Sequence, residues 1–417
     1  MSTHITGIGC SLLDQIYKAV DFSSSTFRKY RSIIDNDGGL QPGKLVFADN
    51  LESFSGEDFS DIILSIAGDR APDAVNLGGP GIVASIHASQ LLAYNDQISI
   101  RFFGVVGSDD AGKKMLSIVA ETPLNQHDLI TLQGDSPSTI VLSDPMYHDG
   151  HGERCFINNL GTANDLTVED IPKGVLAADI VFFGGTALVP KIHDALSQLL
   201  TLAKKHHALT MVSTVYDFRN QQKDASHPWP MVSHMEDFSK IDLLVMDREE
   251  ALRISGTKTI KTALSHFKDL DVGAVIISHG AKAVHLYAAG SPFIPIAPTT
   301  LPISQAIDEV LDRDPACKGD TTGCGDTLAG GILASIADQT EADRNRPIDL
   351  LEAVSWGIVS GGYTCLYMGG TYIEENPGEK LRHIFPYYRE YLKQIDPSLH
   401  ISRHSFSRTT DSQGEPT

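Results

Sequence analysis

The chain has 417 residues, of which 41% are hydrophobic and 21% are charged, a composition typical of a globular protein with a sizeable core. Its 53 acidic residues outnumber its 33 basic residues and give a formal charge of −20, which repels nucleic-acid phosphates and anionic membrane surfaces. These values argue against a nucleic-acid partner, a membrane partner and a largely disordered chain.

The cysteine pattern and the N-terminus indicate a compartment. The five cysteines are odd in number and show no C-x-x-C spacing, so neither a disulfide framework nor a cysteine zinc site is indicated. The segment Met1–Ile5 has no basic stretch followed by an apolar one, and therefore does not resemble a secretory signal. We expect a cytoplasmic protein with reduced thiols.

Short apolar runs alternate with longer amphipathic stretches along most of the chain. The apolar runs predict buried strands at residues 98–106, 179–183, 209–215, 241–246 and 273–278. The amphipathic stretches predict helices at residues 81–94, 111–121, 191–207, 247–255, 259–270 and 327–337. This alternation favours an α/β fold, with a mostly parallel sheet that is covered by helices on both faces.

Two regions break the alternation and have the pattern of half-exposed β structure, Leu40–Phe54 and Thr139–Asn158. We interpret them as parts of a lid, with lid elements near residues 11–55 and 138–160 of a single domain that spans residues 1–395. We also expect a helical insertion at Thr299–Pro315 and a polar, frayed tail at Asp396–Thr417.

The most informative segment is a glycine-rich turn, Asp320–Asp326, that opens directly into an amphipathic helix. Gly323 and Gly325 allow the backbone to bend so that successive N–H groups point outward, and the helix N-terminus adds partial positive charge for an anion. Asp326 follows at once, where a carboxylate can accept a proton from a substrate hydroxyl as a phosphoryl group arrives. The alternative interpretation is that Asp326 only caps the helix.

The segment Asp320-Thr-Thr-Gly-Cys-Gly-Asp326 resembles the D-T-x-G-A-G-D signature of the ribokinase-like, PfkB-type carbohydrate kinases. The resemblance implies that Asp326 is the catalytic base, and that the backbone forms an anion hole at three residues, Gly323, Cys324 and Gly325. It also implies a monovalent cation such as K⁺ near Asp320. Cys324 replaces the usual alanine; its simplest role is to donate its N–H, and a redox switch is the alternative.

Segments near the N-terminus resemble the substrate-binding part of the same family. Gly7-Ile8-Gly9 followed by Asp14 resembles the first strand and its sugar-binding aspartate, and Gly78-Gly79-Pro80-Gly81 resembles the glycine pair that contacts the sugar. Together with Asp326, the resemblance therefore implies that Asp14, Gly78 and Gly79 bind substrate. The asparagine usually found after the glycines is Val83 here, which leaves the identity of the sugar open.

Later segments resemble the ATP- and magnesium-binding motifs. Asp247-Arg-Glu-Glu250 occupies the place of N-x-x-E, whose carboxylate organises Mg²⁺ through water, so the resemblance implies this role for Asp247 and Glu250. ATP binding is implied for five residues, Ser278, Gly280, Thr321, Gly323 and Gly325. Arg219, in a partial D-x-N-x-R match, can contact an anionic group of a ligand or form a surface ion pair.

The resemblance spans about Ile5–Glu390 and implies a ribokinase-like three-layer α/β/α sandwich with a small β-sheet lid, which in this family often forms a homodimer contact. We predict an ATP- and Mg²⁺-dependent kinase that phosphorylates a hydroxyl of a sugar or sugar-like molecule. Three alternatives stay open. They are a nucleoside kinase of the same family, a non-catalytic sugar-sensing relative, and an oxidoreductase in which Gly79–Ala84, matching G-x-G-x-x-A, binds a dinucleotide.

Overall fold

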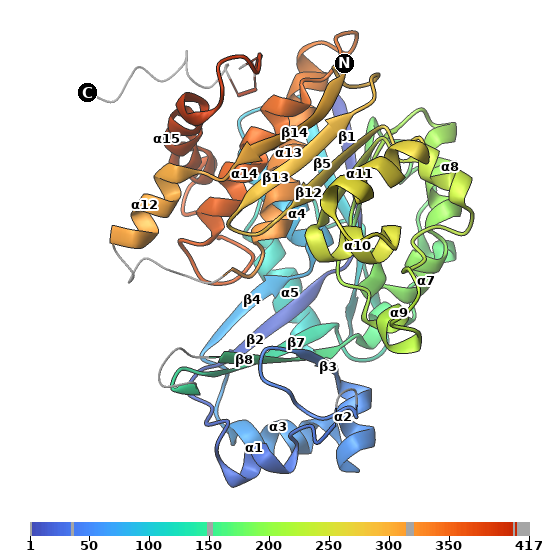
Figure 1. Ribbon diagram of the computed structural model, residues 1–417. Helices are drawn as coiled ribbons and strands as arrows, with labels where there is room; N and C mark the ends of the chain where they lie inside the picture. Colours follow the sequence, from blue (N-terminus) through green and yellow to red (C-terminus); the bar gives the residue numbers. More distant parts are fainter. Residues whose placement is uncertain (1, 35–36, 148–152, 314–320, 403–404, 407–417) are drawn as a thin grey trace.

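The structure is a computed structural model that describes residues 2–34, 37–147, 153–313, 321–402 and 405–406 (Figure 1). Within these residues a large sheet has the strand order β14-β13-β12-β11-β10-β9-β1-β5-β6. The bounds of its strands are β1 Thr3–Gly9, β5 Ile98–Gly107, β6 Leu129–Leu132, β9 Ile180–Gly184, β10 Leu209–Ser213, β11 Leu243–Asp247, β12 Ala274–Ser278, β13 Ala283–Ala288 and β14 Ile296–Pro302.

Every pair of neighbours from β12 across to β6 is parallel, and only β13 and β14 add antiparallel pairs. The strands at the centre of the sheet are buried on both faces, as in Ile180–Gly184, where every residue is buried. Continuous apolar runs are therefore the expected sequence signal of such strands, because both faces of a parallel sheet are covered. The predicted mostly parallel α/β sheet is confirmed.

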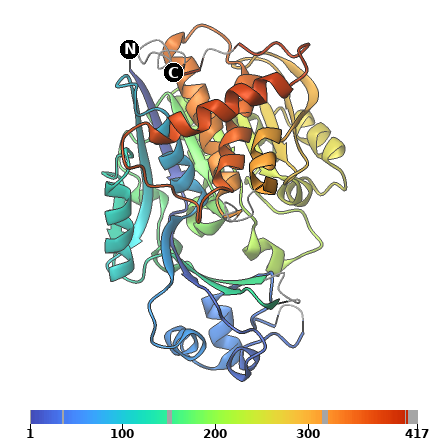
Figure 2. The same cartoon turned by 90° about the vertical axis from the view of Figure 1, so that its left-hand side faces the viewer.

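Helices form a layer on each face of this sheet (Figures 1 and 2). One layer contains α4 Pro80–Leu91, α5 Asp110–Ala120, α13 Cys324–Ala342, α14 Leu350–Thr364 and α15 Glu379–Gln394. The other contains α7 Pro190–Asp194, α8 Leu196–Lys205, α10 Arg248–Ser255 and α11 Ile260–Asp269. The three-layer arrangement agrees with the fold that the sequence predicts.

A second, smaller sheet forms the lid at one end of the molecule, at the bottom of Figure 1. Its order is β3-β8-β7-β2-β4, with bounds β2 Leu12–Tyr17, β3 Leu45–Phe47, β4 Ala74–Gly78, β7 Ser138–Asp144 and β8 Glu153–Asn159. Three helices, α1 Ser25–Lys29, α2 Ala48–Ser55 and α3 Phe59–Ala67, pack on this sheet around a separate apolar core that includes Phe22, Phe27 and Leu142. The segment between Phe22 and Ala74 is thus part of the lid.

Two expectations about local structure are wrong in part. Leu40–Phe54 is mostly helical after β3, because α2 buries Leu51 on one face and ends at Gly56, which has a left-handed backbone. Thr299–Pro315 begins within the edge strand β14, and only Gln305–Arg313 forms the helix α12. Helix α12 packs on the helical layer, where the buried Ile307 lies against Gly362 of α14.

The expected frayed tail is also wrong for its described part. The Phe406 side chain is fully buried, with its ring 4.5 Å from that of Trp356. Backbone N–H groups of Ser402, Ser405 and Phe406 donate to carboxylates of the main body, at 2.6–2.7 Å. The Phe406 ring and these backbone hydrogen bonds together attach this part of the tail to the main body. Among the described residues, no helix combines the length and apolar character that a membrane crossing requires.

Candidate active site

The carboxyl ends of the parallel strands lie at the edge of the large sheet that faces the lid. Strand β1 ends at Gly9 and the chain enters the lid at Leu12, while Gly184 pairs with Gly9 on the neighbouring strand. Farther along the same edge, Asp247 at the end of β11 pairs with Ser278 at the end of β12. Ligands of open α/β sheets bind beyond the carboxyl ends of the strands. The predicted site residues are therefore expected at this edge.

The glycine-rich turn places the N-terminus of α13 at this end of the molecule. Gly323 is the N-cap and has φ of +81°, and a Cβ at this position would lie 2.5 Å from Cα of Gly370. Gly325, in the first helical turn, is exposed, and a Cβ there would have no described atom within 4 Å. Glycine is thus required for the fold at Gly323, whereas at Gly325 it leaves open space beside the helix N-terminus.

The predicted anion hole is not fully open in this structure. The N–H of Cys324 donates to the carbonyl of Thr321 at 3.3 Å, so this donor has an internal partner. A phosphate oxygen has to replace that carbonyl if Cys324 is to bind an anion. Asp320, the first residue of the motif and the expected neighbour of a monovalent cation, lies outside the described residues.

Asp326 lies in the first turn of α13 and is partly exposed. Desolvation by the surrounding protein raises the pKa of its carboxyl to about 7. Burial is the main cause that raises the pKa of the Cys10 thiol and of Glu250, and the charge of Asp326 adds to the rise in both. A carboxyl group with a pKa near neutrality is matched to proton transfer at physiological pH.

Asp14 and the glycine pair meet at the junction of lid and body. Strands β2 and β4 are antiparallel and pair Leu12 with Gly78, and a Cβ at Gly78 would overlap the carboxylate of Asp14. Gly79 has φ of +101°, and a Cβ there would lie 2.8 Å from the carbonyl oxygen of Cys10. Side chains are thus excluded at both glycines, and the buried Asp14 carboxylate lies directly against the first of them.

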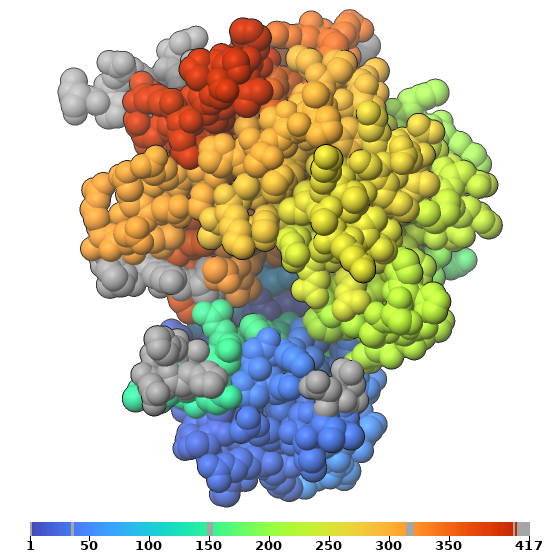
Figure 3. Space-filling view, viewed as in Figure 1, coloured from blue at the N-terminus to red at the C-terminus, as the bar shows by residue number. Residues whose placement is uncertain are grey.

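Asp14 also lines a cavity of about 250 Å³ between the lid and the body. Lid residues including Lys18, Val141 and Arg154 form one wall, and Thr322, Met368 and Gly369 form the other. The space-filling view shows that the surface is hollowed at this level, between the lid and the rest of the molecule (Figure 3). The structure therefore brings Asp14 together with the start of the glycine-rich motif, although they are more than 300 residues apart.

The two carboxylates of the predicted magnesium motif have different environments. Asp247 is exposed and caps α10 by accepting a bond from the N–H of Glu250 at 2.8 Å. Glu250 is buried, and its Oε2 accepts bonds from the Thr214 hydroxyl at 2.6 Å and from the N–H of Asp247 at 3.0 Å. Burial, and next the charge of Asp247, raises the pKa of Glu250 to about 7. These hard oxygen donors fit a Mg²⁺ ion that keeps several of its waters.

Ser278 and Gly280, which the sequence predicts to bind ATP, lie at or just after the carboxyl end of β12. Ser278 ends β12 beside Asp247 and is partly exposed. Gly280 is exposed with φ of +52°, and a Cβ there would have no described atom within 4 Å. An open backbone turn next to a hydroxyl can donate to phosphate oxygens. Ser278 therefore lies next to Asp247 at this edge of the sheet, and the ATP-binding role of Ser278 and Gly280 stays a prediction.

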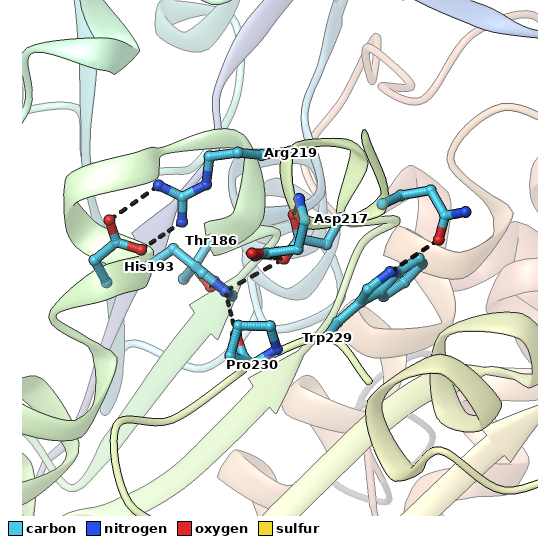
Figure 4. A network of polar contacts seen from close by, with 9 residues as sticks. Thr186, His193, Asp217, Arg219, Trp229 and Pro230 are labelled. Carbon is cyan, nitrogen blue, oxygen red and sulfur yellow. Dashed lines mark hydrogen bonds and ion pairs between the residues drawn. The ribbon is translucent and has the colours of Figure 1, made fainter. Parts of the chain in front are cut away.

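Arg219 belongs to a separate polar network (Figure 4). Its guanidinium donates to both carboxylate oxygens of Asp194, with one contact at 2.9 Å, so the ion-pair interpretation describes its position in this structure. Nearby, His193 is buried and contacts the Thr186 hydroxyl at 2.9 Å and the Pro230 carbonyl at 3.2 Å. Burial lowers the pKa of His193. The network joins α7 and α9 (Phe218–Lys223) to the segment around Trp229.

Two residues that contact the predicted site residues Glu250 and Cys324 were not predicted from the sequence. Thr214 holds Glu250 from the neighbouring strand, and Cys365 places its Sγ 3.3 Å from that of Cys324. Neither residue carries a local motif of its own, because both contacts are made between distant segments. Cys365 was visible only as one of five cysteines.

The dinucleotide-binding interpretation of Gly79–Ala84 is wrong. The strand before this turn, β4, belongs to the lid sheet and pairs antiparallel with β2. A dinucleotide fingerprint needs the turn to follow a strand of a parallel βαβ unit, so that the helix N-terminus faces the pyrophosphate across the sheet edge. The glycines here serve the approach of Asp14 and of the Cys10 backbone instead.

Comparison with known proteins gives a consistent result. The pfkB family carbohydrate kinase profile matches residues 74–375. A fructokinase of Vibrio alginolyticus is 23% identical over 286 residues, which are 68% of this chain and 85% of that protein.

Among solved structures, ribokinase from Thermotoga maritima has a TM-score of 0.60 at 15% identity, covering 93% of this chain and 100% of the other. Adenosine kinase from Sinorhizobium meliloti has a TM-score of 0.63 at 18% identity, covering 92% and 99%. At these identities the two structures establish the ribokinase-like fold, while the profile covers most of the chain, including the glycine-rich turn and Asp326. The chain belongs to the pfkB family of carbohydrate kinases.

Proposed function

We propose that this protein transfers the γ-phosphoryl group of ATP to a hydroxyl of a sugar or sugar-like molecule, with Asp326 as the base. The observation that carries the proposal is the position of Asp326. Its carboxyl, with a pKa raised to about 7, is in the first turn of the helix whose N-terminus adjoins open space at Gly325. A base and a cradle for the transferring phosphoryl group are therefore adjacent.

In the proposed reaction, Asp14 accepts hydrogen bonds from substrate hydroxyls and orients the acceptor hydroxyl toward Asp326. Asp326 takes the proton of that hydroxyl while the hydroxyl oxygen forms the bond to the γ-phosphorus and ADP leaves. Backbone N–H groups of Gly323, Cys324 and Gly325 hold the phosphoryl oxygens. A Mg²⁺ ion, when bound, supplies charge neutralisation on the phosphates, and Glu250 with Asp247 orders its waters.

A sugar is the first choice of substrate because the relative matched over 85% of its length is a fructokinase, and because Asp14 lines the cavity beneath the lid. A carboxylate can accept hydrogen bonds from two neighbouring hydroxyls, a pattern that sugars and the ribose of nucleosides share. The adenosine kinase structure is as similar as the ribokinase structure, so nucleosides belong in any test. A homodimer through the lid and a K⁺ ion near Asp320 stay predictions.

The test is Mg²⁺-dependent release of ADP from ATP with pentoses, hexoses, ketoses, sugar acids and nucleosides as acceptors. Asp326→Asn should lower kcat on the best acceptor by roughly 10²–10⁴-fold, the usual loss when a general base is removed. Asp110→Asn is the matched control, because Asp110 is also in the first turn of a helix but its side chain is 96% exposed. This control should retain the wild-type rate.

The outcomes separate the alternatives. A nucleoside as the best acceptor would replace the sugar proposal by a nucleoside kinase. Binding of ATP and of a sugar, without transfer to any acceptor, would favour the non-catalytic sensing relative. Retention of the wild-type rate in Asp326→Asn would refute the role of Asp326 as the base.

A further inference from the structure

Two thiols face each other at the predicted anion hole. Cys324 is the first residue of α13, and Cys365 follows the last residue of α14. Their Sγ atoms are 3.3 Å apart, and both side chains are partly exposed. Since a disulfide has an S–S distance of about 2.05 Å, the two sulfur atoms need to approach by about 1.3 Å to form one.

The helix ends that carry the two thiols are held together by packing. One turn into α13, the hydroxyl of Thr327 contacts the hydroxyl of Thr364 at 2.6 Å. Gly361 has no side chain between the helices, and a Cβ there would lie 2.8 Å from the carbonyl oxygen of Cys324. The proximity of the two sulfurs is therefore set by the close packing of α13 on α14, and it does not depend on a long surface loop.

The other described cysteines do not share this environment. Cys10 and Cys155 are buried, and burial raises the pKa of both thiols, that of Cys155 to about 12. A buried thiol of raised pKa is unreactive, because the thiolate is the nucleophile. Cys324 and Cys365 thus differ from them in being both partly exposed and within reach of a second sulfur.

We infer that Cys324 and Cys365 are an oxidation site, at which a reversible disulfide stops phosphoryl transfer by constraining the anion hole. The inference rests on the proposed function, in which the Cys324 N–H binds the phosphoryl group. A bond to Cys365 ties the first residue of α13 to the end of α14, next to Gly325 and two residues from Asp326. A displacement of about 1 Å in such a site can cost on the order of 10²-fold in rate.

The oxidant is a peroxide. One thiolate attacks the O–O bond, which gives a sulfenic acid and, after protonation, one water. The thiolate of the other cysteine then attacks the sulfenic sulfur, forms the S–S bond and releases the second water. The two thiols lose two electrons in total, and the peroxide is reduced to two waters. A dithiol reductant reverses the reaction by thiol–disulfide exchange.

The experiment treats the full-length protein with hydrogen peroxide, blocks the remaining thiols and maps cross-linked peptides by mass spectrometry. The expected product joins Cys324 to Cys365, with a loss of activity on the order of 10²-fold that dithiothreitol reverses. Cys365→Ala should keep the basal activity and resist the peroxide. Cys155→Ala, which removes a buried thiol of the lid, should remain as sensitive as the wild type.

Several results would overturn the inference. They are the absence of a Cys324–Cys365 peptide, a cross-link of either cysteine to Cys317 instead, or equal inactivation of wild type and Cys365→Ala. Peptide mapping uses the wild-type protein, so it stays decisive if a variant folds poorly. If the reduced protein phosphorylates no acceptor, the proposed function fails separately, and mapping together with the affinity for an ATP analogue before and after oxidation still tests the pair.

Discussion

Replacement of Gly325 by alanine should separate the stability of the fold from its activity. A Cβ at Gly325 has no atom of the described residues within 4 Å, so the methyl group meets no obstacle among them. Alanine also reduces the conformational freedom of the unfolded chain, which typically stabilises a compatible helical position by about 0.4–1 kcal/mol. We therefore expect the free energy of unfolding to stay unchanged or to rise by this amount.

The same methyl group should strongly reduce phosphoryl transfer. It projects into the space that the proposal assigns to the transferring group, beside the N–H donors of the helix N-terminus. Loss of one oxyanion-hole donor costs about 10²–10³-fold in kcat in other enzymes, and a displaced phosphoryl group should cost at least the lower value. The assay is kcat for ADP release, combined with urea denaturation of the same preparation.

Gly323→Ala is the contrasting variant. The backbone at position 323 has φ of +81°, and a Cβ there would lie 2.5 Å from Cα of Gly370. The variant should therefore lose activity and also about 1–2 kcal/mol of unfolding free energy or more. A Gly325→Ala protein with wild-type stability and wild-type kcat would refute the reasoning, because the open space would then not be the phosphoryl position.

Four further predictions concern Asp326, Phe406 and Arg219. With the pKa of Asp326 at about 7, kcat/KM should fall about tenfold per pH unit below 7, because the protonated carboxyl cannot accept a proton, and a flat profile down to pH 5 would contradict this. Because the folded state binds the proton of Asp326 more tightly than the unfolded chain does, this proton stabilises the fold at low pH, and the stabilisation is lost as the pH rises through 7. Asp326→Asn carries no charge that must be desolvated, so it should unfold at a higher urea concentration than wild type at pH 8. Phe406→Ala should cost about 3–5 kcal/mol of unfolding free energy, against little change for Ile33→Ala at an 85% exposed position, and equal effects would mean that the tail does not attach through Phe406. Arg219→Ala, which breaks a pair whose arginine side chain is 39% exposed, should cost less than about 1 kcal/mol and leave kcat unchanged, whereas a large rise in KM would return Arg219 to the substrate site.

Features that depend on neighbouring residues could be predicted from the sequence. The apolar runs that became β5, β9, β10, β11 and β12 are visible because a strand buried on both faces has no polar alternation. The turn at Gly323 and the helix from Cys324 onward are visible because glycines and a helical apolar stripe are adjacent in the chain. The local pattern is ambiguous where it is short: Leu40–Phe54 has the pattern of half-exposed β structure, whereas Ala48–Ser55 is a helix.

Contacts between distant segments were decided only by the tertiary structure. The sequence shows an aspartate at position 326, but the raised pKa of its carboxyl comes from desolvation by other parts of the chain. It likewise shows Arg219, while the fold supplies Asp194 as its partner. The position of β4 in the lid, which excludes a dinucleotide site, and the 3.3 Å approach of Cys324 to Cys365 are also results of packing. A sequence pattern reports the chemistry that a residue can perform, whereas desolvation and pairing depend on which atoms surround it after folding.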